Sequence, residues 1–366
     1  MIYIIITILL FAISIISLFK RNFSNLNIYY FLILILFFFS AFRYQVGCDW
    51  DGYIHSYLNS SGISFLDIIN LRDPIYYTII YFIHKFDIPQ PFLNIITSAI
   101  FFIGINSLAK RQPNPIIFLS LLFPILIMNM PLSGIRQAAA IGFICLAFVS
   151  FIDRNALRFG IYVILASGFH SSAIIFVLML PFVTGRINLS LIIILLIFSL
   201  FILLLFPFSE VISVINRLYI VKTPEAHGAI YRISYLFLSA IFFFLFIKKK
   251  WLKYFPIDYN LVKIGSLGIF LLIGLIPISS VIADRFGYYF ILIQTIIFAR
   301  LYYLPFNSGH LFYSLIPFLA SFLIFFVWVN TSYHFQGCYI PYDTWIFGFP
   351  ENNSPQPGML HGEHFR

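Results

Sequence analysis

Residues 2–19 read IYIIITILLFAISIISLF, a run without a charged side chain. An apolar run of about 18 residues or more can cross the hydrocarbon core of a bilayer as an α-helix. Residues 189–206 and 311–330 are runs of the same kind, and 61% of the 366 residues are hydrophobic while only 10% are charged. Soluble domains carry about 25% charged residues. The sequence therefore predicts an all-α, polytopic integral membrane protein.

Apolar runs recur along the chain and predict about 12 spanning helices. The predicted spans are 2–19, 26–42, 92–109, 115–130, 135–151, 157–169, 171–184, 189–207, 230–247, 261–282, 286–301 and 311–330. The segment from Asp73 to Asp87 is too short to span and is predicted to be a re-entrant or interfacial helix. Residues 1–330 form the predicted membrane domain, and residues 331–366 form an aromatic and polar C-terminal tail.

Clusters of basic residues predict the orientation of the chain. Lys20-Arg21, Lys110-Arg111 and Lys248-Lys249-Lys250 mark the inner side of the membrane. These clusters also account for the net charge of +9, so no nucleic-acid partner is predicted. Residues 157–183 could form one long helix or two short antiparallel ones, and only the hairpin, with His170 at its outer tip, keeps the Lys248 cluster inside. Both chain ends and the polar motifs below are then predicted to lie outside.

The first polar motif is FRYQVGCDWDGY at residues 42–53. Arg43 offers a fork of donors that suits phosphate, and either Asp49 or Asp51 could act as a general base toward a sugar hydroxyl. Flat aromatic rings with polar tips suit sugar faces, and this loop carries Tyr44, Trp50 and Tyr53. The alternative is an interfacial aromatic belt with one Arg–Asp ion pair. No metal is predicted, because the two carboxylates offer too few oxygen ligands for a hard cation.

The second motif is PLSGIRQAAA at residues 131–140. Arg136 and Gln137 fall in the first turn of a predicted span, where a helix N-terminus favours an anion. The alanines that follow would let neighbouring helices approach closely. The functional interpretation is that Arg136 binds an anionic group inside the protein, and the alternative is that it reaches to the lipid headgroups.

Two further motifs carry titratable groups. His170, in the sequence GFHSSA, could shuttle a proton or make a structural hydrogen bond. Asp284 and Arg285 lie at a predicted helix junction, where Arg285 could be a second phosphate ligand or part of an ion pair. Arg232, beside Tyr231, is a weaker candidate for the same role.

These motifs together resemble the EpsG-type family of Wzy-like O-antigen and exopolysaccharide polymerases. The hydrophobic profile of residues 1–330 is similar to that of the family, and Cys48 stands where a small residue such as Thr is expected. The resemblance rests on residues 42–53, 134–137 with the following alanines, 169–173, and 284–286 with 288–290.

The resemblance implies a glycosyltransferase-type enzyme at the periplasmic face of the bacterial inner membrane. Such enzymes join oligosaccharide repeat units carried on undecaprenyl diphosphate, in exopolysaccharide or lipopolysaccharide biosynthesis. The implied partners are the lipid-linked oligosaccharide and membrane lipid, with a chain-length regulator and a flippase as further candidates, and no cofactor is expected. Arginines would bind the leaving diphosphate, and a carboxylate would act on the acceptor.

Two other functions remain as alternatives. A carrier for lipid-linked oligosaccharide would also use buried arginines, but it predicts internal inverted repeats, and none is visible in the sequence. A ligase that hands finished glycan to an acceptor shares the substrate and the site with a polymerase. A long outer loop that binds the acceptor would favour the ligase, and loops 43–72 and 208–229 are modest.

The cysteines give a prediction about the tail. The predicted topology places Cys48 and Cys338 on the same, oxidising face of the membrane, where disulfides persist. The aromatic residues 333–342 could then fold over the mouth of the site and meet the 43–53 loop. Whether the two thiols are bonded stays open at this point, because two solitary cysteines can face outward by chance.

Overall fold

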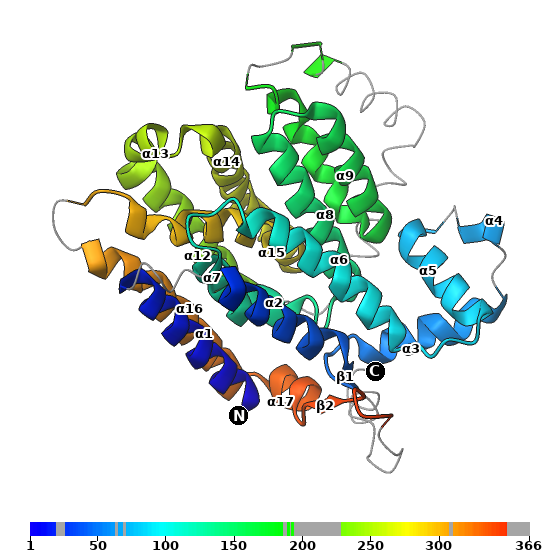
Figure 1. Cartoon of the computed structure of the whole chain (residues 1–366). Helices are drawn as coiled ribbons and strands as arrows, with labels where there is room; N and C mark the ends of the chain where they lie inside the picture. The colour runs from blue at the N-terminus through cyan, green and yellow to red at the C-terminus, as the bar shows by residue number, and fades with distance from the viewer. Residues whose placement is uncertain are drawn as a thin grey trace.

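Helices make up almost all of the regular structure in the described part of the chain. The computed structural model describes residues 1–19, 26–62, 65–68, 71–185, 189–190, 192–193, 228–306 and 310–349. The two strands in these residues, β1 (Arg43–Tyr44) and β2 (Asp343–Thr344), form one antiparallel pair. Figure 1 shows the helices as a bundle, with the N-terminus, α17 and the two strands at one end of it.

Most of the longer helices follow the predicted spans closely. Their bounds are α1 (Ile2–Phe19), α2 (Leu26–Ala41), α6 (Phe92–Ala109), α7 (Pro115–Leu122), α8 (Ile135–Ile152), α9 (Ala156–Phe169), α12 (Ala229–Phe242), α14 (Tyr259–Leu275), α15 (Ser280–Ala299) and α16 (His310–Thr331). A π-helical turn extends α7 over Phe123–Ile127, and another joins α12 to α13 (Lys248–Tyr254) over Phe243–Ile247. The shorter helices are α3 (Trp50–Leu58), α4 (Phe65–Ile68), α5 (Pro74–Lys85) and α17 (Tyr333–Tyr339), with 3₁₀ segments at Asn59–Gly62, Pro256–Asp258 and Leu301–Tyr303.

The all-α membrane-type architecture is confirmed, but the expected 12 spans are not. Seven of the described helices are long and apolar enough to cross a membrane, and four shorter apolar helices, over Leu26–Ala41, Pro115–Ile127, Ala156–Phe169 and Ser171–Phe182, accompany them. The predicted span 189–207 and the Lys20-Arg21 cluster fall almost wholly outside the described residues. The short segment after Asp73 forms the helix α5, as predicted.

The hairpin interpretation of residues 157–183 is confirmed, with one correction. The chain runs through α9, becomes extended at His170 and returns as η4 (Ser171–Phe182), which packs against α9. The returning arm is a 3₁₀ helix, whereas an α-helix was expected. Pro181 lies inside it and has no N–H to donate, which removes one of the bonds that an α-helix would need.

The boundary between α14 and α15 also differs from the prediction. The expected spans were 261–282 and 286–301, but α14 ends at Leu275 and α15 begins at Ser280. Pro277 lies in the break, and the Ser279 hydroxyl caps the next helix by accepting a hydrogen bond from Ile282 N–H at 3.3 Å. Asp284 therefore lies in the second turn of α15 and not at a helix junction.

Close packing places α8 deep in the bundle. A Cβ on Gly104 of α6 would lie 2.0 Å from the carbonyl oxygen of Gly142 in α8, so only glycine allows the two helices to approach this closely. The three alanines at 138–140 are fully buried, as the prediction of close helix approach requires. In Figure 1 α8 lies between α6 and α9, near the centre of the molecule.

A buried ion pair stabilises another part of the bundle. Arg300, after α15, forms an ion pair with Asp258, and both side chains are 5% exposed. Arg300 also donates to Gln112 Oε1 at 2.9 Å, and Trp251 Nε1 donates to Asp258 at 3.2 Å. This network joins α13 and α14 to the segment between α6 and α7.

Candidate functional site

Arg43 holds the loop between α2 and α3 in place. Its side chain is 0% exposed, and it donates to the Pro131 carbonyl at 3.1 Å, to the Val46 carbonyl and to Asn94 Oδ1 at 3.2 Å. Burial lowers the pKa of Arg43 to about 10, so the guanidinium stays charged at neutral pH. A side chain this enclosed does not reach a ligand, and the expectation that Arg43 binds phosphate is replaced by a positioning role.

Gly47 allows this loop to approach the turn before α8. Its φ is +99°, a region that residues with a side chain rarely adopt, and a Cβ there would lie 1.9 Å from the Leu132 carbonyl oxygen. Two residues on, Asp49 is exposed, with its amide 3.3 Å from Ser133 Oγ and that hydroxyl 3.4 Å from its carboxylate. Asp51 is half-buried, and its carboxylate makes no hydrogen bond or ion pair within the described residues.

The aromatic side chains of α3 pack against arginines. Trp50 is buried with the Arg43 guanidinium 5.4 Å from its ring centre. The ring centres of Tyr44 and Trp50 lie 5.5 Å apart, in a T-shaped arrangement. Tyr53 is buried too, 6.0 Å from the ring of Tyr76. The expectation that these rings stack on sugar is therefore corrected for Trp50 and Tyr53, while Tyr44 remains half-exposed.

Arg136 extends from the first turn of α8 toward two tyrosine rings and one carboxylate. Its guanidinium lies 5.9 Å from the Tyr53 ring and 5.5 Å from the Tyr76 ring. Nη1 donates to Asp73 Oδ2 at 2.9 Å, where the Asp73 side chain is 3% exposed and that of Arg136 is 36% exposed. Arg136 is thus a fixed cation that still faces solvent.

His170 lies beside this arginine and is hydrogen-bonded. Its Nδ1 is 2.6 Å from Ser172 Oγ and 3.5 Å from the Tyr289 hydroxyl. Burial and the nearby Arg136, Arg285 and Arg72 lower the pKa of His170 to about 3. An imidazole with so low a pKa is a poor proton acceptor at neutral pH, so the geometry favours the structural interpretation over the proton shuttle.

Arg285 and Arg232, the other two candidate cations, differ in their partners. Gln137, buried in α8, donates to the Arg285 carbonyl, which brings α15 against the start of α8. Arg232 makes two hydrogen bonds to Asp284, at 2.8 and 2.7 Å, and its guanidinium lies 5.2 Å from the Tyr288 ring. The ion-pair alternative given for Asp284 and Arg285 therefore holds for Asp284, whose partner is Arg232, and the phosphate role of Arg285 stays a prediction.

Two residues of this cluster were missed from the sequence. Arg72 donates to Ser171 Oγ at 2.8 Å, and Asp73 accepts from both Arg136 and the Ser171 amide. The signal that could have found them is the charged pair immediately before Pro74, at the start of a short helix.

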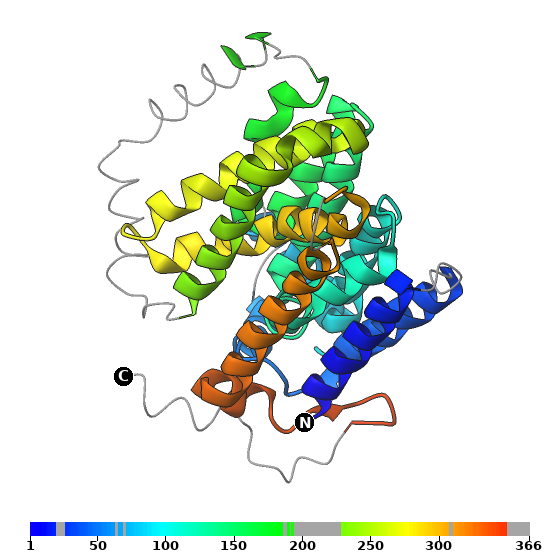
Figure 2. The same cartoon turned by 90° about the vertical axis from the view of Figure 1, so that its left-hand side faces the viewer.

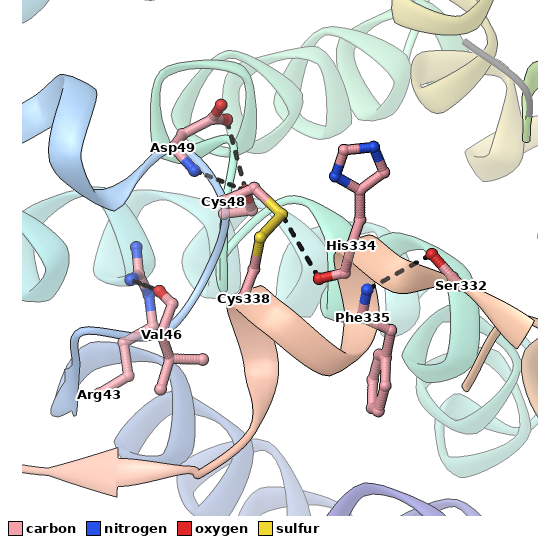
Figure 3. The surroundings of a disulfide bond; sticks show 9 residues. Arg43, Val46, Cys48, Asp49, Ser332, His334, Phe335 and Cys338 are labelled. Atoms are coloured by element: carbon pink, nitrogen blue, oxygen red, sulfur yellow. Dashed lines mark hydrogen bonds between the residues drawn. A yellow bond between two sulfur atoms is a disulfide. The ribbon is translucent and has the colours of Figure 1, made fainter. Parts of the chain in front are cut away.

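The tail meets the 43–53 loop, as predicted, and a disulfide joins them. Cys48 and Cys338 are bonded, with their Cα atoms 4.9 Å apart, which confirms that they lie on the same face (Figure 3). The Gly47 amide donates to the Cys338 carbonyl at 2.7 Å, and β2 pairs with β1. A ring nitrogen of His334 and the two sulfur atoms lie within 4.8 Å of one another, but the sulfurs are bonded to each other and are not available as metal ligands.

The tail also packs against the first helix. Figure 2 shows α17 close to the N-terminus of α1. Tyr3 donates to the Tyr339 carbonyl and Tyr342 donates to the Phe39 carbonyl, both at 2.7 Å. Residues 350–366 of the predicted tail lie outside the described part.

The fold and the site together define a class of protein. The described residues form an all-α, membrane-type bundle, and two arginines of the candidate site, Arg136 and Arg232, are each paired with an aspartate. A family model described as the EpsG family matches residues 26–344, so the chain belongs to the EpsG family. No match was found among curated proteins or among solved structures.

Proposed function

We propose that the protein polymerises oligosaccharide repeat units carried on undecaprenyl diphosphate into O-antigen or exopolysaccharide, at the periplasmic face of the inner membrane. Membership of the EpsG family supports a polymerase-type function. The observation that carries the proposal is Arg136, which is 36% exposed and fixed by Asp73, while Gln137 beside it donates to the Arg285 carbonyl. A lipid-linked donor presents a diphosphate, and arginine is the side chain best suited to bind it at an interface.

In the proposed reaction, the bond between the anomeric carbon of the donor sugar and the diphosphate oxygen breaks as an acceptor hydroxyl oxygen bonds to that carbon. The electron pair leaves with the diphosphate, whose negative charge Arg136 and Arg285 stabilise. The hydroxyl proton passes to a carboxylate. Asp49 is the first candidate, because it is exposed and held by Ser133, and Asp51 is the second.

The surface glycan of a deletion strain tests this function. Without a polymerase we expect a single repeat unit on its final acceptor, and complementation should restore long chains. Arg136→Ala should abolish long chains although the protein accumulates, and Arg136→Lys should rescue poorly, because a point charge does not replace a bidentate fork. Arg158→Ala, at an exposed position of α9, is the matched control. Wild-type chain lengths in Arg136→Ala would contradict the role.

The carboxylates are tested separately. Asp49→Asn keeps the shape of the side chain and removes its charge, so we expect shortened or absent chains, whereas Asp67→Asn, at an exposed position of α4, should leave them unchanged. Asp51→Asn distinguishes the two candidates. If both Asn variants polymerise normally, the 43–53 loop does not supply the base.

The surface glycan of the deletion strain also distinguishes a polymerase from the two alternative functions, the carrier and the ligase. Loss of a carrier that delivers lipid-linked oligosaccharide leaves no glycan at the surface, and loss of a ligase leaves finished chains on the lipid carrier. Either result would replace the polymerase proposal. A single capped unit supports it.

A further inference from the structure

Tyr339 of the tail lies beside Asp49, the first candidate for the base. The disulfide joins the residues that come immediately before these two, Cys338 and Cys48 (Figure 3). The Gly47 amide also donates to the Cys338 carbonyl at 2.7 Å, so the last turn of α17 is fixed against the loop that carries Asp49. Tyr339 is 2% exposed, and its side chain is therefore enclosed where the tail meets this loop.

Aromatic packing holds the Tyr339 ring in place. The ring stacks on that of Phe335, one turn earlier in α17, with the ring centres 5.4 Å apart and the planes 7° apart. The Trp328 ring lies against it in a T-shaped arrangement, with the centres also 5.4 Å apart. The Tyr339 carbonyl accepts a hydrogen bond from the Tyr3 hydroxyl at 2.7 Å. A tyrosine that is held at its ring and at its backbone presents its hydroxyl at a fixed place.

The hydroxyl of Ser133 connects Tyr339 to Asp49. Ser133 accepts from the Asp49 amide at 3.3 Å and donates to the Asp49 carboxylate at 3.4 Å. The Ser133 hydroxyl also forms a hydrogen bond with the Tyr339 side chain. A hydroxyl has one proton and two lone pairs, and the Ser133 proton is already directed at the carboxylate. Tyr339 is therefore the donor in its bond with Ser133.

The Tyr339 phenol keeps its proton, as a donor must. Burial raises the pKa of Tyr339 above its usual value of 10.0, and the nearby Asp49 carboxylate raises it further, while the charges of Arg43 and Arg232 act in the opposite direction. The phenol is thus protonated across the physiological range of pH. Donation from the tyrosine polarises the Ser133 hydroxyl and strengthens the bond that the serine donates to the carboxylate.

We propose that Tyr339 is a positioning residue, which fixes the Ser133 hydroxyl as a donor to Asp49 and so holds the Asp49 carboxylate in the orientation in which it accepts the proton of the acceptor hydroxyl. This rests on the proposed function, since it specifies how the base of that reaction is oriented. Without the phenol, the Ser133 hydroxyl is free to rotate and the carboxylate loses its fixed partner. The C-terminal tail then contributes to catalysis and does not only cover the mouth of the site.

Tyr339→Phe tests this role, because it removes the hydroxyl and keeps the ring. The kinetics are measured on the full-length protein in lipid nanodiscs, and the substrate is the lipid-linked oligosaccharide extracted from the deletion strain. We expect kcat to fall about tenfold and KM to change by less than about twofold, because a misoriented base slows proton transfer and leaves substrate binding intact. Ser133→Ala should have the same effect.

Tyr342→Phe is the matched control. It removes another hydroxyl of the tail, which donates to the Phe39 carbonyl at 2.7 Å and has no hydrogen bond to Ser133 or Asp49 in the described part of the chain. We expect its kcat to equal that of the wild type. If Tyr342→Phe lowers kcat as much as Tyr339→Phe does, the tail acts through its packing alone and the inference is overturned.

Double variants separate positioning from general damage to the fold. In an Asp49→Asn background kcat is already low, and Tyr339→Phe should lower it no further, whereas a structural defect would add to the loss. Tyr339→Phe combined with Ser133→Ala should be no worse than either change alone. Additive losses in both combinations would overturn the inference. If Ser133→Ala does not fold, Tyr339→Phe in the Asp49→Asn background still decides it.

The outcomes also distinguish this inference from the proposed function. A wild-type kcat in Tyr339→Phe, together with a low kcat in Asp49→Asn, would overturn this inference and leave the proposed function intact. A wild-type kcat in Asp49→Asn would remove the base on which the role of Tyr339 depends, and would overturn the inference although polymerisation persists. Long chains in the deletion strain would refute the proposed function instead.

Discussion

Replacing Cys48 and Cys338 together by serine tests how firmly the tail holds the Asp49 loop. The disulfide joins residues that are 290 positions apart in sequence. Hydrogen bonds also hold the tail, including that from the Gly47 amide to the Cys338 carbonyl at 2.7 Å and that from the Trp345 amide to the Phe42 carbonyl at 3.0 Å. The double variant keeps these bonds, so we expect a tail that opens more often and is still attached.

The free energy by which the disulfide stabilises the closed tail depends on the length of the loop that it closes. If the helices stay in the membrane, the free segment runs from Thr331, where α16 ends, to Cys338. The chain-entropy relation gives about 2.4 kcal/mol for a loop of about seven residues, and about 5.7 kcal/mol for a loop of about 290 residues in a fully unfolded chain. The smaller value applies to local opening, and it corresponds to about a 50-fold rise in the population of the open tail.

Hydrogen–deuterium exchange of the purified protein measures this opening. Peptides that contain Gly47 and Trp345 should exchange about 50-fold faster in the double variant. Cys145→Ala is the control, because Cys145 is a buried free thiol away from the tail. Treatment of the wild type with a dithiol reductant should reproduce the variant. Unchanged exchange in both would refute the idea that the disulfide restrains the tail.

Three further predictions concern stability and pH. Gly47→Ala should destabilise the protein by about 1–3 kcal/mol, because φ is +99° there and a Cβ would meet a backbone carbonyl, whereas Gly52→Ala, with nothing within 4 Å, should be neutral or stabilising in a thermal melt. The pKa of His170 falls to about 3 in the folded protein, whereas an unfolded histidine has a pKa of about 6.5, so the stability of the fold should decline as the pH falls below about 6.5. Thermal melts at pH 7.5 and 5.0 should show a smaller decline in His170→Gln than in the wild type. Asp258→Asn leaves Arg300 buried without its counter-ion and should cost about 3–5 kcal/mol, measured by chemical denaturation.

Most of the helices could be predicted from the sequence, because their signal is local. A long apolar run without charge, such as residues 2–19, forms a helix whatever its neighbours are. The hairpin at His170 was predicted by a rule of the same kind, since basic clusters fix on which side of the membrane each loop lies. The exact start of α15 was missed because Pro277 and the Ser279 cap act within one turn, below the resolution of a hydropathy pattern.

The roles of the arginines could be predicted only in part, because partners are set by tertiary contacts. Arg43 and Asp49 lie close in sequence and suggested an ion pair, but Arg43 donates to the Pro131 carbonyl, 88 positions away. Asp73 reaches Arg136 across 63 positions, and no local pattern announces that bond. The sequence therefore predicted which residue types lie at this face, but it did not indicate which of their side chains are buried.

The hydrogen-bonding capacity that remains on each arginine indicates which of them is suited to bind a ligand. Arg43 directs its donors at two carbonyls and an amide and is fully buried, and Arg232 directs two donors at Asp284. Arg136 uses Nη1 for Asp73, its Nε is buried without a partner among the described residues, and its side chain is 36% exposed. A donor that is removed from water without an acceptor costs free energy, and a bound phosphate oxygen would recover it. Of these three guanidinium groups, Arg136 is therefore the one best suited to bind an anion.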